Sequence, residues 1–411
     1  MQPIRSDRAA AAALDEDDPL AGFRERFAFG DGGDDDGVIY LDGNSLGRLP
    51  RDTLARLTEI VSEQWGGRLI RAWNEGWMEL PRKLGDRIGE ALLGAAPGQV
   101  AVADSTTVCF YKLAAAALAA RPGRTEIVTD RNNFPTDRYL LESLAAEREL
   151  TVRWIDADPR SGPQPEDVAA LIGPDTALVT FTQVDYRSAY ILDSRSITEI
   201  AHAAGAMTLW DLSHSVGAIP VELDEEGIDL AVGCTYKYLN GGPGAPAFLY
   251  VRREHQPHLR QPIWGWLGRR DPFEMAQGYE PGDGITAMLS GTPPVLGLTA
   301  ASVGIELAIE AGIDNIRTKA IALTEYAIEL ADQRLADVGV TIGSPRNAAR
   351  RGAHVALVHP QARALTRQLI DEGVIVDFRT PDVIRLGLSP LTTRFTDVWD
   401  GIERVGAILS R

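Results

Sequence analysis

The feature that most constrains this 411-residue chain is an alternation of short apolar runs and longer helical patterns, which begins near residue 99. The runs are rich in β-branched residues, which is typical of strands buried on both faces. Strands that alternate with helices pair in parallel, because each helix returns the chain to the edge where the previous strand began. The alternation therefore predicts an α/β fold with a largely parallel sheet and helices on both faces. The expected strands are 126–129, 151–155, 177–182, 207–212, 230–234 and 247–251.

Helical patterns fill the gaps between these strands. One pattern covers 136–148, and another over 196–205 begins at Ser196 with Glu199 three residues later, which is the arrangement of a capping box. Gly205 then stands where a C-terminal glycine ends a helix. These elements continue the strand–helix alternation expected of a sheet covered on both faces.

The pattern changes after the glycine- and proline-rich segment 291–297. A long helical stretch, 298–335, has a break at Gly312 and leads into further strand-like runs and a closing helix. This order is typical of a smaller α+β unit that follows a larger α/β one. The later strand-like runs are 354–358 and 374–378, and the closing helix is 396–409.

This change of pattern divides the chain into three predicted parts. We predict a large domain over 51–297 and a smaller α+β domain over 298–411. The N-terminal segment, 1–50, is expected to pack with the smaller domain. Within it, the glycine- and aspartate-rich run 30–37 is too polar to be buried and is predicted to be a mobile loop.

Charge and cysteine content exclude several classes of protein. With 41 basic against 58 acidic side chains, the chain has a net charge of −17, whereas nucleic acids and anionic membranes are bound by basic surfaces. The apolar run 9–14 is too short for a signal peptide, and no run reaches the roughly 18 residues of a membrane span. Cys109 and Cys234 are the only cysteines, so no disulfide framework is expected. We expect a cytoplasmic protein with no nucleic-acid or membrane partner.

Polar residues at the ends of two predicted strands carry the first chemical signal. Asp211 lies at the end of one strand, and Lys237 follows the next strand, 26 residues later. Open α/β sheets bind ligands outside the carboxyl ends of their strands. A pyridoxal phosphate site requires a lysine that forms a Schiff base and an aspartate that keeps the pyridine nitrogen protonated. The alternative is a solvated lysine in a glycine turn and an aspartate that caps a helix.

Two further strand ends carry compatible groups. Ser105, Thr106 and Thr107 precede an alanine-rich helix, whose free N–H groups and dipole suit a phosphate. An ordinary N-cap is the alternative for these residues. Phe134 follows another strand, where it either stacks on a cofactor ring or packs against the helix after it. The sequence does not decide between a ligand site and these structural alternatives at any one position. All of these residues, however, lie at strand ends of one predicted sheet.

Other reactive side chains give weaker signals. His255 and His258 flank a proline, so no helix presents them together to a metal, and no metal site is predicted. Both are expected to be exposed loop residues. Lys83 and Lys112 have no aspartate partner at a strand end and do not compete as the cofactor lysine. His202 is expected to be structural, and both cysteines are expected to be small buried hydrophobic residues.

The segments DLSHSVG and CTYKYLNGGPG, around Asp211 and Lys237, resemble those of the kynureninases, a family of the class V aminotransferase superfamily. The resemblance implies pyridoxal phosphate as cofactor and the large-domain fold of type I pyridoxal phosphate enzymes. That fold has a seven-stranded, mostly parallel sheet like that of aspartate aminotransferase. These two motifs alone indicate the superfamily, and the additional motifs point to the family. The additional motifs, in family order, are GNSLG (43–47), FPTD (134–137), GWLG (265–268), GTPP (291–294), RRGAHVAL (350–357) and IRLGLSPL (384–391).

The resemblance also implies a role for each matching residue. Lys237 would form the Schiff base and Tyr236 would act as an acid or base, so these two are the implied catalytic residues. Trp266 and Thr292 would reach the site from the partner subunit of a homodimer. Arg385 would bind the substrate carboxylate, a task that suits a planar bidentate donor. The implied cofactor contacts are Thr106, Thr107, Phe134, Asp137, Thr182 (placed by spacing), Asp211, His214, Tyr236, Lys237, Trp266 and Thr292.

The implied activity is hydrolytic cleavage of the Cβ–Cγ bond of L-kynurenine, or its 3-hydroxy form, in tryptophan catabolism. The products would be L-alanine and anthranilate, or 3-hydroxyanthranilate. Relatives that favour 3-hydroxykynurenine carry Ser-Asn where this chain has Gly291 and Thr292, and a histidine in the region of Trp73. These three positions are expected to contact the substrate and to favour unhydroxylated L-kynurenine. Trp77 and Trp264 are expected to pack in the core or an interface instead.

Three alternative functions are distinct from this one. The first is action on a ring-substituted kynurenine in secondary metabolism, and the second is another type I pyridoxal phosphate reaction, such as a lyase or cysteine desulfurase. A desulfurase uses a cysteine on a mobile C-terminal loop, and neither cysteine of this chain has that position. The third is a non-catalytic protein that keeps the fold. The complete set Asp211, His214, Tyr236, Lys237 and Arg385 argues against it.

Overall fold

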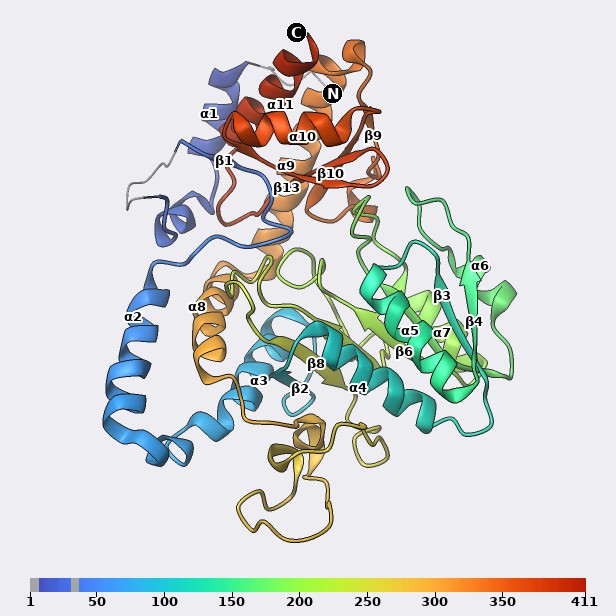
Figure 1. Ribbon diagram of the computed structural model, residues 1–411. Coiled ribbons are helices and arrows are strands. Elements are labelled where there is room, and N and C mark those ends of the chain that lie inside the picture. The colour runs from blue at the N-terminus through green and yellow to red at the C-terminus, as the bar shows by residue number, and fades with distance from the viewer. Residues whose placement is uncertain (1–6, 31–36) are drawn as a thin grey trace.

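The computed structural model describes residues 7–30 and 37–411, and the predicted loop 30–37 lies outside these ranges except for its two end glycines. The described strands form three sheets, of seven, four and two strands. Figure 1 shows the largest sheet in the middle of the molecule and the four-stranded sheet above it. The strands are β1 (Ile39–Tyr40), β2 (Val100–Ala103), β3 (Glu126–Asp130), β4 (Thr151–Ile155), β5 (Thr176–Thr182), β6 (Met207–Asp211), β7 (Leu230–Gly233), β8 (Ala247–Val251), β9 (Thr341–Ile342), β10 (His354–Val358), β11 (Val374–Ile375), β12 (Asp377–Arg379) and β13 (Val383–Gly387).

Helices connect most of these strands and also form an arm near the N-terminus. The α-helices are α1 (Arg8–Glu16), α2 (Asp52–Glu59), α3 (Leu80–Leu92), α4 (Thr106–Ala119), α5 (Pro135–Arg148), α6 (Pro165–Leu171), α7 (Ser194–Ala203), α8 (Val295–Ala311), α9 (Ile313–Arg334), α10 (Ala362–Asp371) and α11 (Phe395–Leu409). A π-helical segment, η2 (Ile60–Arg68), extends α2, and the short 3₁₀ helices are η1 (Ala21–Arg26), η3 (Leu69–Trp73), η4 (Trp77–Glu79), η5 (Trp266–Gly268), η6 (Gly284–Met288), η7 (Ala336–Val338) and η8 (Ala348–Arg350).

The seven-stranded sheet confirms the predicted α/β architecture. Its strand order is β2-β8-β7-β6-β5-β3-β4, with β8 antiparallel to its neighbours and β3 to β7 parallel to one another. Parallel pairing places the carboxyl ends of β5, β6 and β7 at one edge of the sheet. The register aligns Thr182 with Asp211 and Asp211 with Val232. Side chains that are far apart in the sequence therefore meet at this edge.

Two apolar layers cover the faces of this sheet. One core contains buried residues of α4 and α5, and the other contains residues of α3, α6, α7 and α8. The inner strands between them, such as β5 and β8, are buried along their full length, whereas the edge strand β4 is partly exposed. Burial on both faces explains why these runs are continuously apolar instead of alternating with polar residues.

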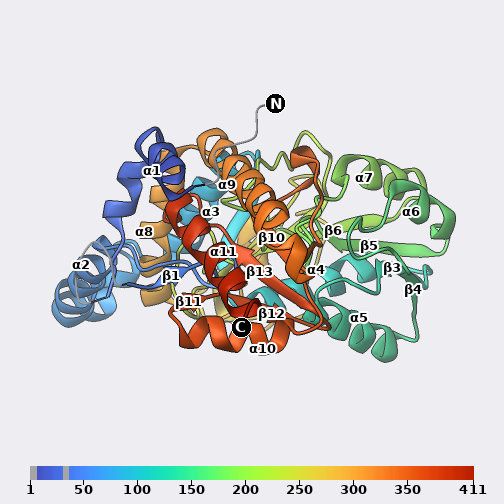
Figure 2. The same cartoon turned by 90° about the horizontal axis from the view of Figure 1, so that it is seen from above.

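The C-terminal third forms its own core on an antiparallel sheet of order β12-β13-β10-β9. Helices α9 and α10 pack against this sheet, α11 packs against both helices, and Figure 2 shows the three together at this end of the molecule. Strand β1 pairs in parallel with β11, and α1 packs against α11, so the N-terminal region contributes to the same unit.

The junction between the two cores lies at Gly312. Helix α8 contributes its buried residues to a core of the seven-stranded sheet, although the expected boundary, residue 297, falls inside this helix. Gly312 has φ +77°, and the chain bends there by 84° before α9 begins. Only glycine adopts that backbone conformation readily, which explains the break predicted at this residue.

Two local predictions are wrong in detail. Helix α7 begins at Ser194, and its N-cap is Asp193, whose side chain accepts a hydrogen bond from the Ser196 backbone, so the capping box at Ser196 does not form. The run 374–378 is split between β11 and β12, which belong to different sheets. Within the described residues, no single helix combines the length and apolar composition of a membrane span; α8 and α9 meet both criteria only as a bent pair.

Candidate active site

A cavity of about 240 Å³ lies at the carboxyl edge of the seven-stranded sheet. The residues around it come from the strand ends of β5, β6 and β7 and from the first turns of α4 and α5. Most of the residues implied to contact the cofactor are brought together here. They are Thr106, Thr107, Phe134, Asp137, Thr182, Asp211, His214, Tyr236 and Lys237, and they are joined by Thr136, Tyr186 and Ser213.

Lys237 is held inside this cavity. The residue is 9% exposed, and its Nζ lies 3.0 Å from Nε2 of His214 and 5.9 Å from the ring centroid of Phe134. Burial and the nearby Lys237 charge hold the pKa of His214 well below its ordinary value, so the imidazole is neutral and accepts a hydrogen bond from the lysine. Lys237 is therefore not the solvated turn lysine of the alternative interpretation.

Two buried carboxyl groups share the cavity with this single lysine. Asp211 ends β6 and accepts a hydrogen bond from the Ser213 backbone at 2.8 Å, whereas Oδ2 of Asp137 has no partner among the described residues. Burial raises the pKa of both groups, and the charge of Asp211 raises that of Asp137 further. A cationic ligand atom would relieve this excess of negative charge.

The first turn of α4 offers a site for an anion. Ser105 is the N-cap and accepts a hydrogen bond from the Val108 backbone, which leaves Thr106 and Thr107 in the first turn beside the cavity. The hydroxyl of Thr106 is buried and has no partner among the described residues. Free N–H groups, the helix dipole and two hydroxyls together favour a phosphate. The cavity thus has an anion-binding end and a carboxylate end.

Aromatic rings form another wall of the cavity. Phe134 packs edge-on against Tyr186, with 5.3 Å between the ring centroids. Burial, followed by the nearby Cys234 and Asp211, raises the pKa of Tyr236. The tyrosine hydroxyl is therefore protonated near neutral pH. A tyrosine that acts as a base near neutral pH needs a lowered pKa, whereas this environment raises the pKa of Tyr236.

The other implied site residues do not line this cavity. Trp266, Gly291 and Thr292 lie in the segment 252–294, between β8 and α8. Figure 1 shows this segment, here called the projecting segment, at the end of the molecule opposite the four-stranded sheet. The ring of Trp73 lies 6.2 Å from that of Trp266, in an edge-to-face contact. Arg385 lies on β13, 1% exposed, and donates a hydrogen bond to the backbone carbonyl of Tyr186. Arg385 is thus linked to the cavity wall, whereas the aromatic and glycine positions lie elsewhere.

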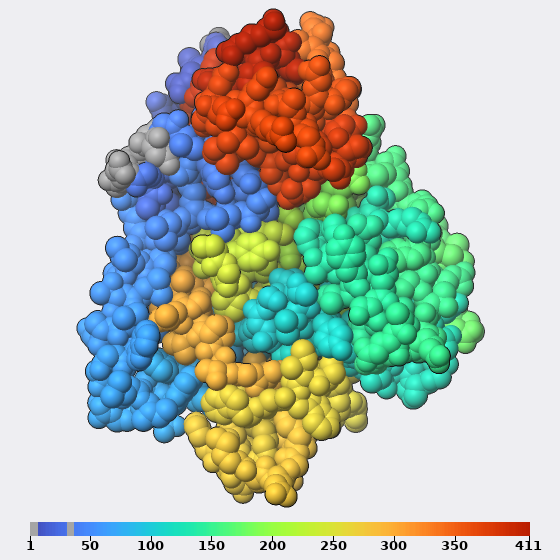
Figure 3. All heavy atoms as spheres, viewed as in Figure 1, coloured from blue at the N-terminus to red at the C-terminus, as the bar shows by residue number. Residues whose placement is uncertain are grey.

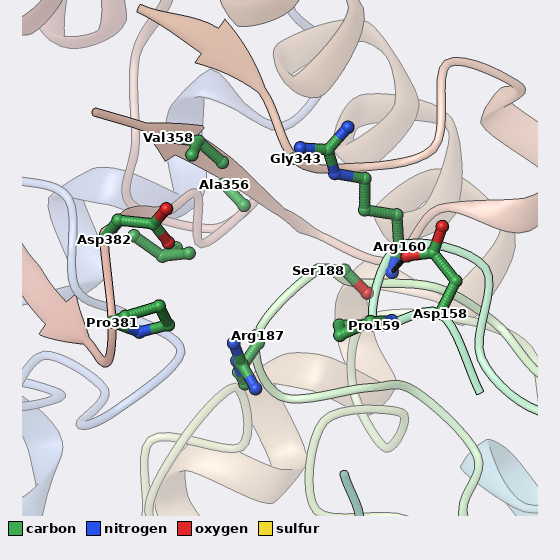
Figure 4. A pocket seen from close by; sticks show the side chains of 11 residues that line it. Asp158, Pro159, Arg160, Arg187, Ser188, Gly343, Ala356, Val358, Pro381 and Asp382 are labelled. Carbon is green, nitrogen blue, oxygen red and sulfur yellow. Dashed lines mark hydrogen bonds between the residues drawn. The ribbon is translucent and has the colours of Figure 1, made fainter. Parts of the chain in front are cut away.

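A second cavity, of about 340 Å³, lies between the large sheet's loops and the four-stranded sheet (Figure 4). It shares the loop after β5 with the first cavity, since Tyr186 lines the first one and Arg187 the second. None of the sequence-predicted site residues lines it. Its lining is Asp158, Pro159, Arg160, Arg187, Ser188, Gly343, Ala356, Val358, Pro381, Asp382 and Val383.

Curated relatives match the chain over nearly its full length. The kynureninase of Pseudomonas fluorescens is 43% identical over 406 residues, which cover 97% of this chain and 94% of the relative. The chain belongs to the kynureninase family. The kynureninase of Burkholderia pseudomallei strain K96243 is also 43% identical, over 98% of this chain and 95% of the relative. In addition, residues 316–405 match the family model described as the kynureninase C-terminal domain.

Solved structures with the same fold come from more distant proteins. A cysteine desulfurase from Thermococcus onnurineus NA1 superposes with a TM-score of 0.78 at 18% identity, over 91% of this chain and 95% of that one. The cysteine desulfurase CsdA of Escherichia coli gives 0.78 at 16% identity, over 95% and 98%. A mutant of the protein C-DES, solved with glycine linked to its pyridoxal phosphate, gives 0.77 at 18% identity, over 91% and 96%. These similarities establish that this kynureninase-family chain has the predicted fold.

The structure corrects several expectations about other residues. Lys112 does have an aspartate partner, since its buried Nζ lies 2.6 Å from Asp104, directly after β2. His255 is not a free loop residue, because it and His202 both contact Asp229, at 2.6 and 2.9 Å. The expectation for the cysteines is confirmed, as both are buried.

The two tryptophans expected to pack in the core or an interface, Trp77 and Trp264, are both at least partly exposed. Trp264 is 61% exposed and stacks on Tyr279, with 4.7 Å between the ring centroids, so it is not a core residue. Trp77 is half-buried and donates a hydrogen bond to Gln64 at 2.7 Å. Trp264 is therefore not part of the core, and its packing in an interface stays a prediction.

Three cavity residues were missed by the sequence reasoning. Thr136 lies within the motif FPTD and Ser213 within DLSH, so both motifs already contained a signal for them. Tyr186 lies four residues beyond Thr182, in a loop that has no distinctive motif. Only the path of the chain after β5 places its ring beside Phe134.

Proposed function

We propose that this chain is a pyridoxal phosphate-dependent hydrolase that cleaves the Cβ–Cγ bond of L-kynurenine into anthranilate and L-alanine, a step of tryptophan breakdown. The observation that carries the proposal is the single cavity in which Lys237 lies beside a neutral His214, between buried carboxyl groups and the first turn of α4. Family membership supplies the substrate class, and the cavity supplies groups suited to its chemistry.

The residues present fit pyridoxal phosphate. The first turn of α4, with the unpartnered hydroxyl of Thr106, suits the phosphate, and Phe134 offers a ring face beside Lys237. Asp137 and Asp211 are buried acidic groups that a protonated ring nitrogen would neutralise. When bound, the cofactor supplies the electron sink that stores the charge left on the substrate's α carbon.

The chain's own residues then handle binding and proton transfer. Lys237 is placed to remove the proton at the α carbon, and the neutral imidazole of His214 accepts a hydrogen bond from its amine. The protonated hydroxyl of Tyr236 can donate to the carbonyl oxygen whose carbon is hydrated. As the carbon–carbon bond breaks, the same oxygen of Tyr236 takes back one proton of the hydrated group, and a second proton of that group goes to the β carbon, which leaves a carboxylic acid. Tyr236 is thus proposed as an acid first and a base second.

Arg385 is proposed to bind the substrate's α-carboxylate. Its guanidinium is fully buried and hydrogen-bonded to the carbonyl of Tyr186, a residue of the cavity wall. A buried, planar, permanently charged donor binds a carboxylate with defined orientation. This contact would align the amino acid in the cavity for proton removal at its α carbon.

A homodimer with shared active sites is part of the proposal. Large apolar side chains are exposed on α2 to η3, among them Leu54 (72%), Trp65 (56%) and Ile70 (74%). Others are exposed on the projecting segment, including Phe273 (56%) and Met275 (74%). Figure 3 shows both regions along the lower margin of the molecule. Exposed apolar surface of this extent is typical of a protein interface.

An interface there would bring Trp266, Gly291 and Thr292 toward the partner's cavity, which explains why they do not line their own. With Trp73 beside Trp266, these positions are proposed to contact the aromatic ring of the substrate and to favour unhydroxylated L-kynurenine. Two free, buried thiols also suit the reducing cytoplasm, which we propose as the location.

The desulfurase alternative has no support from the cysteines. Cys109 and Cys234 are both buried, and burial raises the pKa of both thiols. A nucleophilic cysteine has to be accessible and readily ionised. The structural similarity to desulfurases therefore reflects the fold and not that reaction.

The test is anthranilate release from L-kynurenine by the purified, cofactor-loaded protein. We expect turnover and a visible absorbance band that both disappear in Lys237→Ala, because no other lysine of the described chain lines the cavity. The matched control Lys83→Ala changes an exposed lysine and should keep both. Absence of bound cofactor in the unmodified protein would refute the proposal at its base. Turnover restricted to 3-hydroxykynurenine or to another ring-substituted kynurenine would refute only the substrate preference.

A further inference from the structure

The guanidinium of Arg385 is held by a single carboxylate along one of its edges. Its Nε donates to Oδ1 of Asp377 at 2.7 Å, and its Nη2 donates to Oδ2 of the same residue. Two parallel hydrogen bonds between a guanidinium and a carboxylate fix both groups in one plane. Asp377 therefore fixes the orientation of Arg385 before any ligand binds.

Backbone pairing fixes where Asp377 stands. Strands β12 and β13 are antiparallel neighbours, and their register places Asp377 directly opposite Arg385. Directly opposed residues on adjacent strands point to the same face of the sheet. The contact between the two side chains thus follows from the hairpin itself.

Asp377 also holds together a wider group of charges. It accepts a hydrogen bond from the hydroxyl of Ser45 at 2.9 Å and lies 2.7 Å from Nη2 of Arg379. Burial alone would raise the pKa of Asp377, but the two arginines lower it more. The pKa therefore lies below its ordinary value, and the carboxylate is ionised. Burial and the charge of Asp377 raise the pKa of Asp42 to about 6. Loss of Asp377 would leave two arginines close together without their common counter-ion.

The opposite edge of the guanidinium is turned toward the cavity wall. Nη1 of Arg385 donates to the carbonyl of Tyr186 at 2.6 Å, and Nη2 donates to the hydroxyl of Ser45 at 3.0 Å. Tyr186 itself lines the candidate active site. Because Asp377 occupies the Nε edge, a substrate carboxylate would have to approach this terminal edge, where it can accept a hydrogen bond from the second N–H of Nη1 or replace the hydroxyl of Ser45.

We infer that Asp377 is a positioning residue, which holds the terminal edge of Arg385 toward the substrate carboxylate, with Ser45 as their shared hydrogen-bond partner. The inference rests on the proposed function, since it assumes that Arg385 binds an α-carboxylate. It differs from the reverse possibility, in which Asp377 competes with the substrate for Arg385. A positioning residue strengthens carboxylate binding, and a competitor weakens it.

The test compares Asp377→Asn with the unmodified holoenzyme. L-Alanine carries the α-carboxylate, and its dissociation constant is measured by titration calorimetry alongside kcat and KM for L-kynurenine. We expect the dissociation constant and KM to rise by about tenfold or more, because one charged partner of Arg385 is lost, while kcat changes by only a few-fold. A dissociation constant that is unchanged or lower would overturn the inference.

Two controls separate positioning from a general structural effect. Asp382→Asn removes a carboxylate from the same β12–β13 hairpin without touching Arg385 and should leave both constants unchanged. Binding of kynuramine, which lacks the carboxylate, should be unaffected by Asp377→Asn. Weakened kynuramine binding would show a general disturbance of the site and overturn the inference.

A double variant tests whether Asp377 acts through Arg385. If it does, Asp377→Asn should weaken L-alanine binding in an Arg385→Lys background by less than about twofold. Additive losses would show that Asp377 acts elsewhere and would overturn the inference. If the unmodified protein binds L-alanine in this Asp377-dependent way but does not cleave L-kynurenine, the proposed function fails and the positioning role stands.

Discussion

Asp137 and Asp211, two single residues of the candidate site, destabilise the cofactor-free protein. Both carboxyl groups are buried, and burial raises the pKa of each above its ordinary value. A raised carboxyl pKa means that the ionised form is less favourable in the folded chain than in the unfolded one. The empty protein is thus destabilised at neutral pH by charges that the cofactor's ring would compensate.

Asp211→Asn should therefore separate stability from function. We expect the cofactor-free variant to gain about 1 kcal/mol in free energy of unfolding at neutral pH, since a buried negative charge is removed. Activity should fall by about a hundredfold or more, because nothing then holds the ring nitrogen protonated. Urea unfolding and anthranilate release measure the two effects.

Asp156→Asn is the matched control for this prediction. Asp156 directly follows β4, another strand of the same sheet, and its side chain is 75% exposed. Removal of this solvated charge should change neither stability nor turnover appreciably. A loss of stability in cofactor-free Asp211→Asn would contradict the electrostatic account.

The contact between His202 and Asp229 should make the stability of the protein depend on pH. Its hydrogen bond to Asp229 raises its pKa above the ordinary value of 6.5, and Asp229 is held ionised by His202 and His255 although burial opposes this. A raised histidine pKa contributes stability that is fully present below about 6.5 and is lost as the pH rises through the folded value. The unmodified protein should therefore lose this contribution on the alkaline side.

The measurement is the unfolding midpoint of the unmodified protein and His202→Gln from about pH 5.5 to about pH 9. The difference between the two should be largest at the acidic end and shrink toward the alkaline end. His258→Gln alters an exposed imidazole on the neighbouring loop and serves as the control. A difference that grows with pH would contradict the assigned direction.

At the scale of elements, α8 lies unusually close to the loop that carries the candidate lysine. A Cβ on Gly304 would lie 2.1 Å from the carbonyl oxygen of Leu239 and 2.8 Å from that of Asn240. Asn240 is hydrogen-bonded through its backbone to the carbonyl of Lys237. The absence of a side chain at Gly304 is therefore what lets the helix support this loop.

Gly304→Ala should lower the free energy of unfolding by about 2 kcal/mol. An alanine in a helix gains about 1 kcal/mol over glycine, but contact with two backbone oxygens forces the helix and loop apart, and this effect is larger. The displaced loop should also bind the cofactor more weakly. Urea unfolding and cofactor titration are the measurements, and Ser302→Ala on the same helix is the control. A stabilised Gly304→Ala would mean that helix propensity outweighs the close contact.

At the scale of the whole molecule, the proposed site residues fall into two groups that one chain does not bring together. Lys237 lies in the cavity, while Trp266 lies on the projecting segment, beside Trp73 and Phe273. Large apolar side chains are exposed on that segment and on the α2 to η3 arm. A two-fold dimer can join each cavity to the partner's projecting segment, because its interface is the same on both chains.

Subunit complementation tests this arrangement. Lys237→Ala and Trp266→Ala should each be inactive alone. After they are mixed and reassembled, about a quarter of the unmodified activity should return, since half of the dimers are mixed and each holds one intact site. Sedimentation should show a dimer, and Asp271→Asn, on the projecting segment, should behave as the unmodified protein. No recovery in mixed dimers would contradict shared sites.

The alternating pattern of the sequence was sufficient to predict the strands β3 to β8 and the strand ends that carry Asp211 and Lys237. These predictions succeed because the inner strands of a sheet covered on both faces are continuously apolar, and ligands bind such sheets at the carboxyl ends of the parallel strands. The break at Gly312 was predictable for a similar reason, as a positive φ favours glycine.

Tertiary structure decided the features that depend on where distant segments meet. The cap of α7, the ring of Tyr186 beside Phe134, and the partnership of Lys112 with Asp104 have no signal in local periodicity. The same is true of Asp377, whose hold on Arg385 depends on the register of β12 against β13. The sequence by itself determined the sheet and the polar residues at its carboxyl ends, because burial and ligand binding restrict residue types locally. Side-chain partners were decided only by the fold, because contacts between separate elements depend on packing, which no local pattern encodes.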